Sequence, residues 1–264
     1  MLTAAKKQLR VCLLSIKYNI MREMVNKVTF LTNVCFMVLN NASILVQWFI
    51  LFRLREDVGG YTFREILFLW GLTAASFGLS HILFARAFSL SDLIIKGKLD
   101  SFLVQPKNVL VSVITSSTSI SAIGDLLYGV ALVCAFRPGV GGFFLFLLFT
   151  VTGTVVFTAF ALLLGSLSFW FVRMDMIQGQ MVMSAVSFAT YPDGIFEGIS
   201  RFLLYFFIPV GMAVWHPVHV MVRFDAGMLL AVLGYAFALS AAAVAVFYRG
   251  LKRYASGNLI EARM

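Results

Sequence analysis

The residues best suited to chemistry are a few polar side chains inside long apolar stretches. Asn33, Asn40 and Gln47 follow one another at intervals of seven residues, which is close to two helical turns and places them on one line of an α-helix. Asp125 is the carboxylate deepest within another apolar stretch, and it follows a hydroxyl-rich run at 112–121 that could solvate it. Such groups face protein or a water-filled cavity when they lie in a membrane. Two interpretations remain open for all four residues: a pathway lining, or hydrogen bonds between helices.

Motifs for catalysis, metal binding and nucleotide binding are missing from the sequence. No phosphate-binding loop of the G-x-x-x-x-G-K-[ST] type occurs. His216, His219 and Asp225 could in principle share a metal, but Pro217 interrupts regular helical spacing between the two histidines. We therefore expect a polar surface there and no metal site. We also expect that the chain is not an enzyme and binds no cofactor itself.

The apolar stretches are long enough to cross a bilayer. A hydrocarbon core about 30 Å thick needs about 20 apolar helical residues. The chain is 61% hydrophobic and 12% charged, whereas a soluble domain is about 25% charged. We predict an all-α integral membrane fold with six transmembrane helices, at residues 28–52, 64–85, 110–136, 142–170, 176–192 and 227–248.

The distribution of charge predicts the orientation. Lys and Arg concentrate in every second gap between the predicted spans, so the positive-inside rule places both ends and the loop at 86–107 in the cytoplasm. The net charge of +9 then reflects topology and contact with anionic membrane lipids rather than a nucleic-acid partner. Residues 1–27 are predicted to form an interfacial N-terminal helix. Residues 193–226, interrupted by Pro209, are predicted to form an external re-entrant or broken helical segment before the last span.

The cytoplasmic loop at 86–107 is too apolar to be a solvated linker. Ser89 or Ser91 can cap a short helix that Gly97 ends, and Pro106 stops a second apolar turn. The apolar side chains of this second turn are Leu99, Phe102 and Leu103. Two such turns beside a membrane bury their apolar faces either against lipid headgroups or against a soluble partner.

Two segments carry a resemblance to a known family. The run from Lys96 to Pro106, KGKLDSFLVQP, resembles the G-x-L-D-x-x-L-x-x-P loop of ABC-2 type transporter permeases. The family's Y-P … I-P … P segment resembles the part of this chain that contains Tyr191, Pro192, Pro209 and Pro217. Asp193 departs from the pattern by adding a charge after the Tyr-Pro pair. The resemblance extends over essentially the whole chain, so we treat residues 1–264 as one transmembrane permease domain.

The resemblance implies the permease subunit of an ABC transporter, usually an exporter in such families. The subunit would pair with a second permease and with a separate nucleotide-binding ATPase subunit, and ATP and Mg would bind to that partner. It would be a multi-pass protein of the plasma membrane, in bacteria the inner membrane. The coupling contacts would come from Asp92, Lys96, Gly97, Leu99, Asp100, Phe102, Leu103 and Pro106. The external mouth would be formed by Tyr191, Pro192, Pro209 and Pro217.

Two classes of function remain open from the sequence. An exporter with walls rich in phenylalanine, of which there are 27, suits an amphipathic cargo such as a drug, lipid, peptide or glycan. The alternative is a non-transporting membrane scaffold that recruits a soluble partner through its cytoplasmic loop. A scaffold does not need a polar line along a span, so Asn33, Asn40 and Gln47 favour transport.

Overall fold

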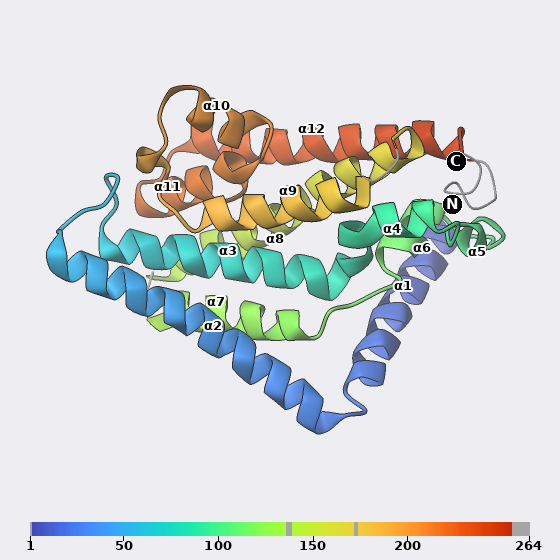
Figure 1. Cartoon of the computed structure of the whole chain (residues 1–264), viewed down its shortest axis with the longest axis horizontal. Coiled ribbons are helices and arrows are strands. Elements are labelled where there is room, and N and C mark those ends of the chain that lie inside the picture. Colours follow the sequence, from blue (N-terminus) through green and yellow to red (C-terminus); the bar gives the residue numbers. More distant parts are fainter. Residues whose placement is uncertain (1, 136–138, 172–173, 255–264) are drawn as a thin grey trace.

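The computed structural model describes residues 2–135, 139–171 and 174–254, and the regular elements within these ranges are all helical. The long helices run side by side in an elongated bundle, with short helices at its two ends (Figure 1). The predicted cytoplasmic tail from residue 255 onward lies outside the described residues. The elements are α1 (Leu2–Glu23), α2 (Lys27–Leu54), α3 (Phe63–Phe84), η1 (Ala85–Ser89), α4 (Leu90–Ile95), α5 (Asp100–Leu103), α6 (Val109–Ile114), α7 (Ser121–Ala135), α8 (Gly139–Ser166), η2 (Leu167–Phe169), α9 (Met174–Ala189), η3 (Asp193–Ile195), α10 (Gly198–Phe206), the π-helix η4 (Gly211–Trp215), α11 (His216–Val222) and α12 (Ala226–Leu251).

Four helical stretches of the described chain are long and apolar enough to cross a membrane. They are α2, the α3–α4 stretch Phe63–Ile95, the α8–η2 stretch Gly139–Phe169, and α12. The pair formed by Gly198–Phe206 and Gly211–Val222 is bent by 71° and counts as a fifth span if its two halves are taken together. This bend agrees with the predicted broken segment before the last span. The six predicted spans are not confirmed by this count.

Two of the predicted spans form shorter helices than expected. The stretch at 110–136 is divided, because α6 ends at Ile114 and α7 begins only at Ser121. The hydroxyls of Thr115 and Ser116 donate to backbone carbonyls of the preceding turn, and such local bonds compete with the helical pattern. α7 and α9 have 15 and 16 residues. At 1.5 Å per residue they extend over about 23 and 24 Å, less than the bilayer core.

α3 and α8 form the centre of the bundle. In their most apolar windows, 72% of the residues of the α3 stretch and 67% of those of the α8 stretch are buried, against 11% for α2 and 17% for α12. Glycines allow close approach in this centre: a Cβ atom added to Gly129 of α7 would lie 2.4 Å from the carbonyl oxygen of Gly71 in α3. α7 is therefore held closely against the centre of the bundle.

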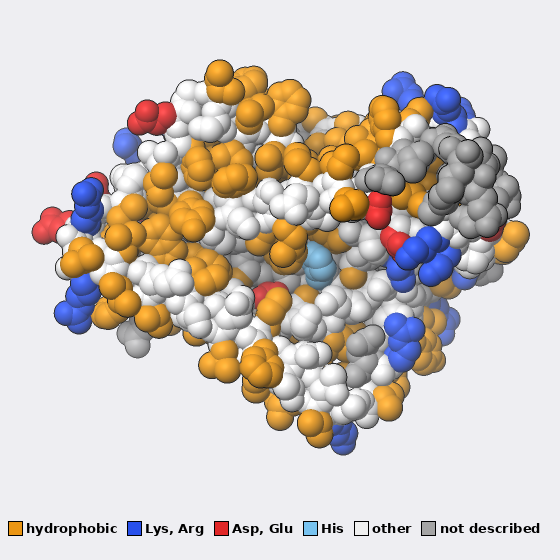
Figure 2. All heavy atoms as spheres, viewed as in Figure 1, with side chains coloured by type: hydrophobic (Ala, Val, Ile, Leu, Met, Phe, Trp, Pro, Cys, Tyr) orange, Lys and Arg blue, Asp and Glu red, His pale blue; other side chains and the backbone are white. Residues whose placement is uncertain are grey.

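The outer surface is that of a protein surrounded by lipid. α2 exposes large apolar side chains such as Val28, Phe36 and Leu54. Many hydrophobic side chains lie across the middle of the face seen in Figure 2, among uncharged atoms, one acidic side chain and one His, whereas Lys and Arg lie at its margins. This separation is expected when the middle of the bundle lies in hydrocarbon and its ends in the headgroup region.

The N-terminal helix α1 forms a corner with α2 (Figure 1). The side chain of Asn26 caps α2 by accepting a hydrogen bond from the backbone amide of Thr29 (3.1 Å). The Ser15 hydroxyl donates to the carbonyl of Thr115 (3.1 Å), which ties α1 to the α6–α7 connection. The helix itself agrees with the sequence, and its position at a membrane surface remains a prediction.

Candidate functional site: a polar cavity and the contacts at its two ends

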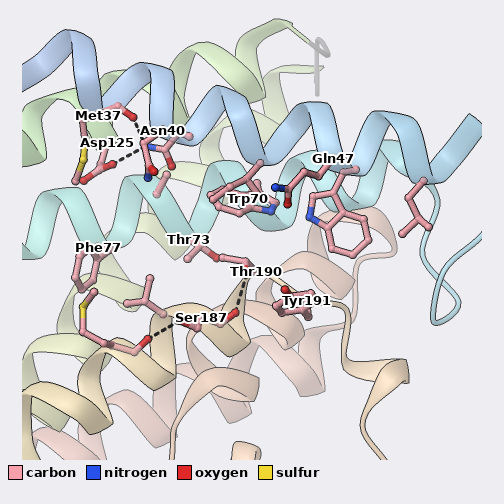
Figure 3. Close-up of a pocket in the computed structure, with 17 residues that line it drawn as sticks. Met37, Asn40, Gln47, Trp70, Thr73, Phe77, Asp125, Ser187, Thr190 and Tyr191 are labelled. Carbon is pink, nitrogen blue, oxygen red and sulfur yellow. Dashed lines mark hydrogen bonds between the residues drawn. The ribbon is translucent and has the colours of Figure 1, made fainter.

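A cavity of about 480 Å³ lies between α2, α3, α7 and α9 (Figure 3). This volume is within the range of pockets for drug-sized ligands. Its wall is mainly apolar and includes the indole rings of Trp48 and Trp70. All four helices add polar side chains, namely Asn40, Asn41, Gln47, Thr73, Asp125, Ser187 and Thr190.

Asp125 enters this cavity from α7 and is only 6% exposed. Its Oδ1 accepts a hydrogen bond from Nδ2 of Asn41 at 2.7 Å. The same amide group donates to the carbonyl of Met37 at 3.0 Å, which fixes its orientation. The prediction that hydroxyls at 112–121 solvate Asp125 was wrong: the hydrogen bond to its carboxylate comes from Asn41, and Ser119 and Ser121 bond to each other instead.

The predicted polar line of α2 reaches this cavity only in part. Asn40 and Gln47 line it, whereas Asn33 lies in a separate cavity of about 240 Å³ beside the α6–α7 connection. A repeat of seven drifts by about 20° each time on a straight helix, and α2 leans away from the bundle towards its start (Figure 1). Asn41 was missed by sequence reasoning, although its position next to Asn40 in an apolar stretch was a usable signal.

Gln178 of α9 fastens the loop at 86–107 to the bundle. Its side chain is 1% exposed. Oε1 accepts a hydrogen bond from the backbone amide of Ser91 at 3.1 Å, and Nε2 donates to the carbonyls of Ala87 at 2.7 Å and Ala161 at 2.8 Å. One side chain thus joins η1, α4, α8 and α9. Sequence reasoning missed it, and the available signal was a glutamine inside the apolar stretch 176–192.

The space for Gln178 depends on a glycine of α8. A Cβ atom added to Gly165 would lie 2.7 Å from Nε2 of Gln178 and 2.8 Å from Cβ of Leu90. Contacts below 3 Å require a neighbour to move, and here both neighbours are held by burial. Gly165 is therefore needed to bring α4 and α9 together on α8.

The predicted coupling residues divide into buried and exposed sets. Gly97 has a φ of +66° and follows the end of α4, as predicted. Asp92 and Lys96 form an ion pair one turn apart on α4 (2.5 Å), with both side chains largely exposed. Asp100 is half-buried beside Tyr254, and burial together with this neighbouring carboxylate raises the pKa of the Tyr254 phenol. Pro106 is exposed.

The apolar turn of the loop is split in the same way. Leu99 is fully buried in an internal cluster that includes Phe169 and Phe247, so its side chain stabilises the loop and offers no surface to a partner. Phe102 packs against this cluster. Leu103 is 40% exposed and the neighbouring Val104 is 84% exposed. The apolar surface that remains available at this end is therefore formed by Leu103 and Val104.

The predicted mouth residues lie at the opposite end of the bundle. The side chain of Tyr191 lines the cavity, and its carbonyl accepts a hydrogen bond from Nε1 of Trp215 at 2.9 Å. Pro192 is buried directly after it. Pro209 lies in the break between α10 and η4, and Pro217 lies in the first turn of α11. Pro192 and Pro209 thus lie in breaks between helices, and of these four residues Tyr191 is the one whose side chain lines the cavity.

Asp193 connects this segment to the α2–α3 loop. It is 2% exposed, and its Oδ2 accepts hydrogen bonds from Arg201 at 2.5 Å and from the Tyr205 hydroxyl at 3.0 Å. Its Oδ1 lies 3.4 Å from Nε2 of His219, which in turn is 3.1 Å from the Tyr61 hydroxyl. Burial by itself would raise the pKa of Asp193, but His219, Tyr61 and Arg201 together lower that pKa far below its usual range. The charge that looked like a departure from the family pattern is the centre of a network.

This network also accounts for the histidines considered as metal ligands. His219 pairs with Asp193, whereas Asp225 caps α12 by accepting a hydrogen bond from the amide of Met228 at 3.0 Å. In the part of the chain that the structure describes, no three His, Cys, Asp or Glu side chains are grouped closely enough to hold a metal ion.

One comparison with known proteins gives a match, and it includes most of the residues that line the cavity. The family model described as ABC-2 family transporter protein matches residues 38–257, from within α2 to beyond the end of α12. No curated protein and no solved structure matches the chain. Because the matched region is most of the chain and includes the loop at 86–107 and the broken segment, the chain belongs to the ABC-2 family of transporter membrane proteins.

Proposed function

We propose that this chain is the permease subunit of an ABC exporter, which pairs with a second permease and docks a separate ATPase subunit. Membership in the ABC-2 family supports a permease that works with an ATP-binding subunit. ATP and Mg bind to that partner, and this chain carries the cargo. The cargo is amphipathic, because the cavity combines an apolar, aromatic wall with polar groups from four helices.

The observation that carries the proposal is the position of α9. Near its start, Gln178 holds the cytoplasmic loop through Ala87 and Ser91. Nearer its end, Ser187 and Thr190 line the cavity. The nine residues from Gln178 to Ser187 correspond to about 13 Å of helix. Because a helix transmits displacement along its axis, movement of the loop on ATP binding shifts one wall of the cavity.

The loop offers a docking surface of defined chemistry. Leu103 and Val104 are exposed apolar residues, and the lysines at 98 and 107 beside them in the sequence are exposed as well. Such a surface fits a groove with an apolar floor and an acidic rim on the ATPase subunit.

The start of α1 and the end of α12 lie at the same end of the bundle as this loop (Figure 1). We assign this end to the cytoplasm, the termini included, and propose six spans, with α7 and α9 completing the set.

The docking surface is tested by substitution of Leu103 in the full chain, co-expressed with the partner ATPase subunit and the second permease of the proposed complex. Leu103→Asp places a charge in an apolar contact, so we expect the ATPase to be lost from the purified complex. Leu103→Met keeps the apolar surface and should retain the ATPase. Normal composition and normal cargo-stimulated ATP hydrolysis with Leu103→Asp would show that the loop does not dock this partner.

The scaffold alternative is addressed by a different measurement. A scaffold has no use for a polar cavity between α2, α3, α7 and α9, so the cavity favours transport. ATP-dependent movement of cargo in vesicles that contain the reconstituted complex supports the exporter. A complex that assembles and hydrolyses ATP without moving any cargo supports the scaffold.

A further inference from the structure

Asp125 has a hydrogen-bond partner for only one of its two carboxylate oxygens. Oδ1 accepts from Asn41, and no further bond to Asp125 occurs among the residues whose side chains the structure describes. Among those described side chains no Lys, Arg or His pairs with it; the ion pairs involve Asp92 and Asp193 instead. His81, one turn beyond the cavity residue Phe77, bonds to the Phe77 carbonyl. The carboxylate therefore faces the cavity without a counter-ion.

An unpaired carboxylate at this depth is costly. Asn41 lies at the middle of the 28-residue helix α2, so its partner Asp125 is placed near the centre of the apolar zone. Ionisable groups inside membranes are paired or face a ligand pathway, because hydrocarbon does not solvate charge. A structural bond to Asn41 alone would need only a neutral amide. The carboxylate is thus best explained by a positive group that enters the cavity.

The walls of the cavity favour the same class of ligand. Trp48, Trp70, Phe77 and Tyr191 all line it, and the faces of such rings attract cations. The ring centroids of Trp48 and Tyr191 are 5.9 Å apart in an edge-on arrangement, which makes one aromatic corner. These rings also offer apolar surface to the body of a ligand.

A second unused group lies further along the cavity. Nε1 of Trp70 is buried and has no hydrogen-bond partner in the described part of the chain, and Trp70 is 5% exposed. Figure 3 shows Asp125 at one end of the cavity and the side chains of Trp70 and Gln47 close together nearer the other end. Gln47 is six residues beyond Asn41, a rise of about 9 Å along α2. The cavity therefore offers the carboxylate of Asp125 to a positive group and, about 9 Å further along α2, the N–H of Trp70 to a hydrogen-bond acceptor.

We propose that this cavity binds an amphipathic organic cation. Its positive group pairs with Asp125, its apolar body lies against the rings of Trp48 and Phe77, and a hydrogen-bond acceptor meets Trp70 and Gln47. As a statement about cargo this rests on the proposed function, whereas binding itself does not require the ATPase. The cation acts as the counter-ion that the described chain does not supply for Asp125.

The experiment measures binding of radiolabelled tetraphenylphosphonium to the full chain in lipid nanodiscs. Tetraphenylborate, of similar size and opposite charge, is the matched probe. We expect saturable binding of the phosphonium and at least tenfold weaker binding of the borate. Asp125→Asn keeps the shape and the bond to Asn41, so we expect about tenfold weaker phosphonium binding, the size of one lost charged contact. Asp175→Asn removes an exposed charge from the start of α9 and should leave binding within twofold.

Several results would overturn the inference. Equal binding of the two probes by the unmodified chain would do so even if Asp125→Asn failed to fold. Unchanged phosphonium affinity in a folded Asp125→Asn variant would show that the carboxylate is not the recognition group. If no cation binds and Asp125→Asn separates a dimer, the counter-ion comes from a second copy of the chain. Loss of binding with intact ATPase docking through Leu103 removes only this inference, whereas binding without ATPase association removes the proposed function.

Discussion

Gln178 and Asp125 are both buried polar side chains in an apolar bundle, and they differ in how fully their hydrogen-bonding capacity is used. Gln178 uses both amide protons and its oxygen on backbone groups of other elements. Asp125 has one partner among the described residues, Asn41, and borders a cavity. A neutral group with every bond made holds helices together. A charged group with one bond made leaves binding capacity for something else.

The comparison gives a rule for polar residues in this bundle. Gln178 lies where α4, α8 and α9 meet, and a Cβ atom at Gly165 would leave it no room. Asp125 lies where α2, α3, α7 and α9 enclose about 480 Å³. A polar side chain whose hydrogen bonds are all made and that is closely packed has a structural role. A polar side chain that borders a cavity and keeps a free oxygen has room for a ligand. The expected effects on stability therefore decrease from the first site to the second.

The largest effect is expected for Gln178→Leu. It removes three buried hydrogen bonds, to the carbonyls of Ala87 and Ala161 and from the amide of Ser91, so we expect the free energy of unfolding in micelles to fall by about 2–4 kcal/mol. Gln180→Leu is the matched control, because Gln180 is exposed on the same helix. Denaturant titration of the purified chains measures both. Equal losses for the two variants would contradict the structural role of Gln178.

The next effect is expected for Asp193→Asn at the opposite end of the bundle. The substitution removes the ionised partner of Arg201 and His219, with an expected loss of about 1–3 kcal/mol at neutral pH. Asp225→Asn is a suitable control, since asparagine caps a helix about as well as aspartate.

The same site predicts a dependence on acid. The pKa of Asp193 is lower in the folded chain than the ordinary value near 3.9. Its stabilisation is therefore fully present above that ordinary value and is lost as the pH falls below it towards the folded-state pKa. The difference in unfolding free energy between the wild type and Asp193→Asn should stay constant from pH 7 down to about pH 5 and should narrow progressively below about pH 4. A difference that does not narrow would show that the charge of Asp193 does not contribute.

A smaller effect is expected for Gly165→Ala. The added methyl group meets Gln178 and Leu90, and such overpacking costs about 1–2 kcal/mol. In Gly179→Ala the new methyl group meets nothing within 4 Å, so better helix propensity should stabilise the chain slightly. Opposite signs in the two unfolding measurements support the contact with Gln178. Tolerance of both substitutions would mean that α4 and α9 can move apart at no cost.

The smallest effect on stability is expected for Asp125→Asn, and this result separates the role of Asp125 from that of Gln178. The amide retains the shape of the side chain and the bond from Asn41, and it removes a buried charge, so we expect a change below about 1 kcal/mol. Denaturant titration of the same preparations used for cation binding measures it. A loss as large as that of Gln178→Leu would mean that Asp125 is a structural residue like Gln178.

Local patterns allowed much of this to be predicted. Hydrophobic length indicated the helices α2, α3, α8 and α12, because a bilayer imposes a minimum length that is visible in the sequence. Gly97 and Pro209 indicated a helix end and a bend, because backbone preferences are properties of single residues. The family resemblance, based on the loop at 96–106 and the Tyr-Pro segment, is confirmed by the match over 38–257.

The partners of the polar residues could not be read from the sequence in the same way. Spacing put Asn33, Asn40 and Gln47 on one line, but only the tilt of α2 decided that Asn33 lies apart from the other two. Leu99 and Leu103 looked alike as apolar loop residues, and packing buried one and exposed the other.

The sequence by itself determined the membrane class, the family and the approximate places of the helices, since these depend on composition, length and local backbone preference. Only the tertiary structure decided that Asn41 joins Asp125, that Gln178 holds the loop, and that Asp193 ties the broken segment to the α2–α3 loop. Each of these contacts joins residues far apart in the chain. Their geometry depends on how whole helices tilt and pack, and that is a property of no single stretch of sequence.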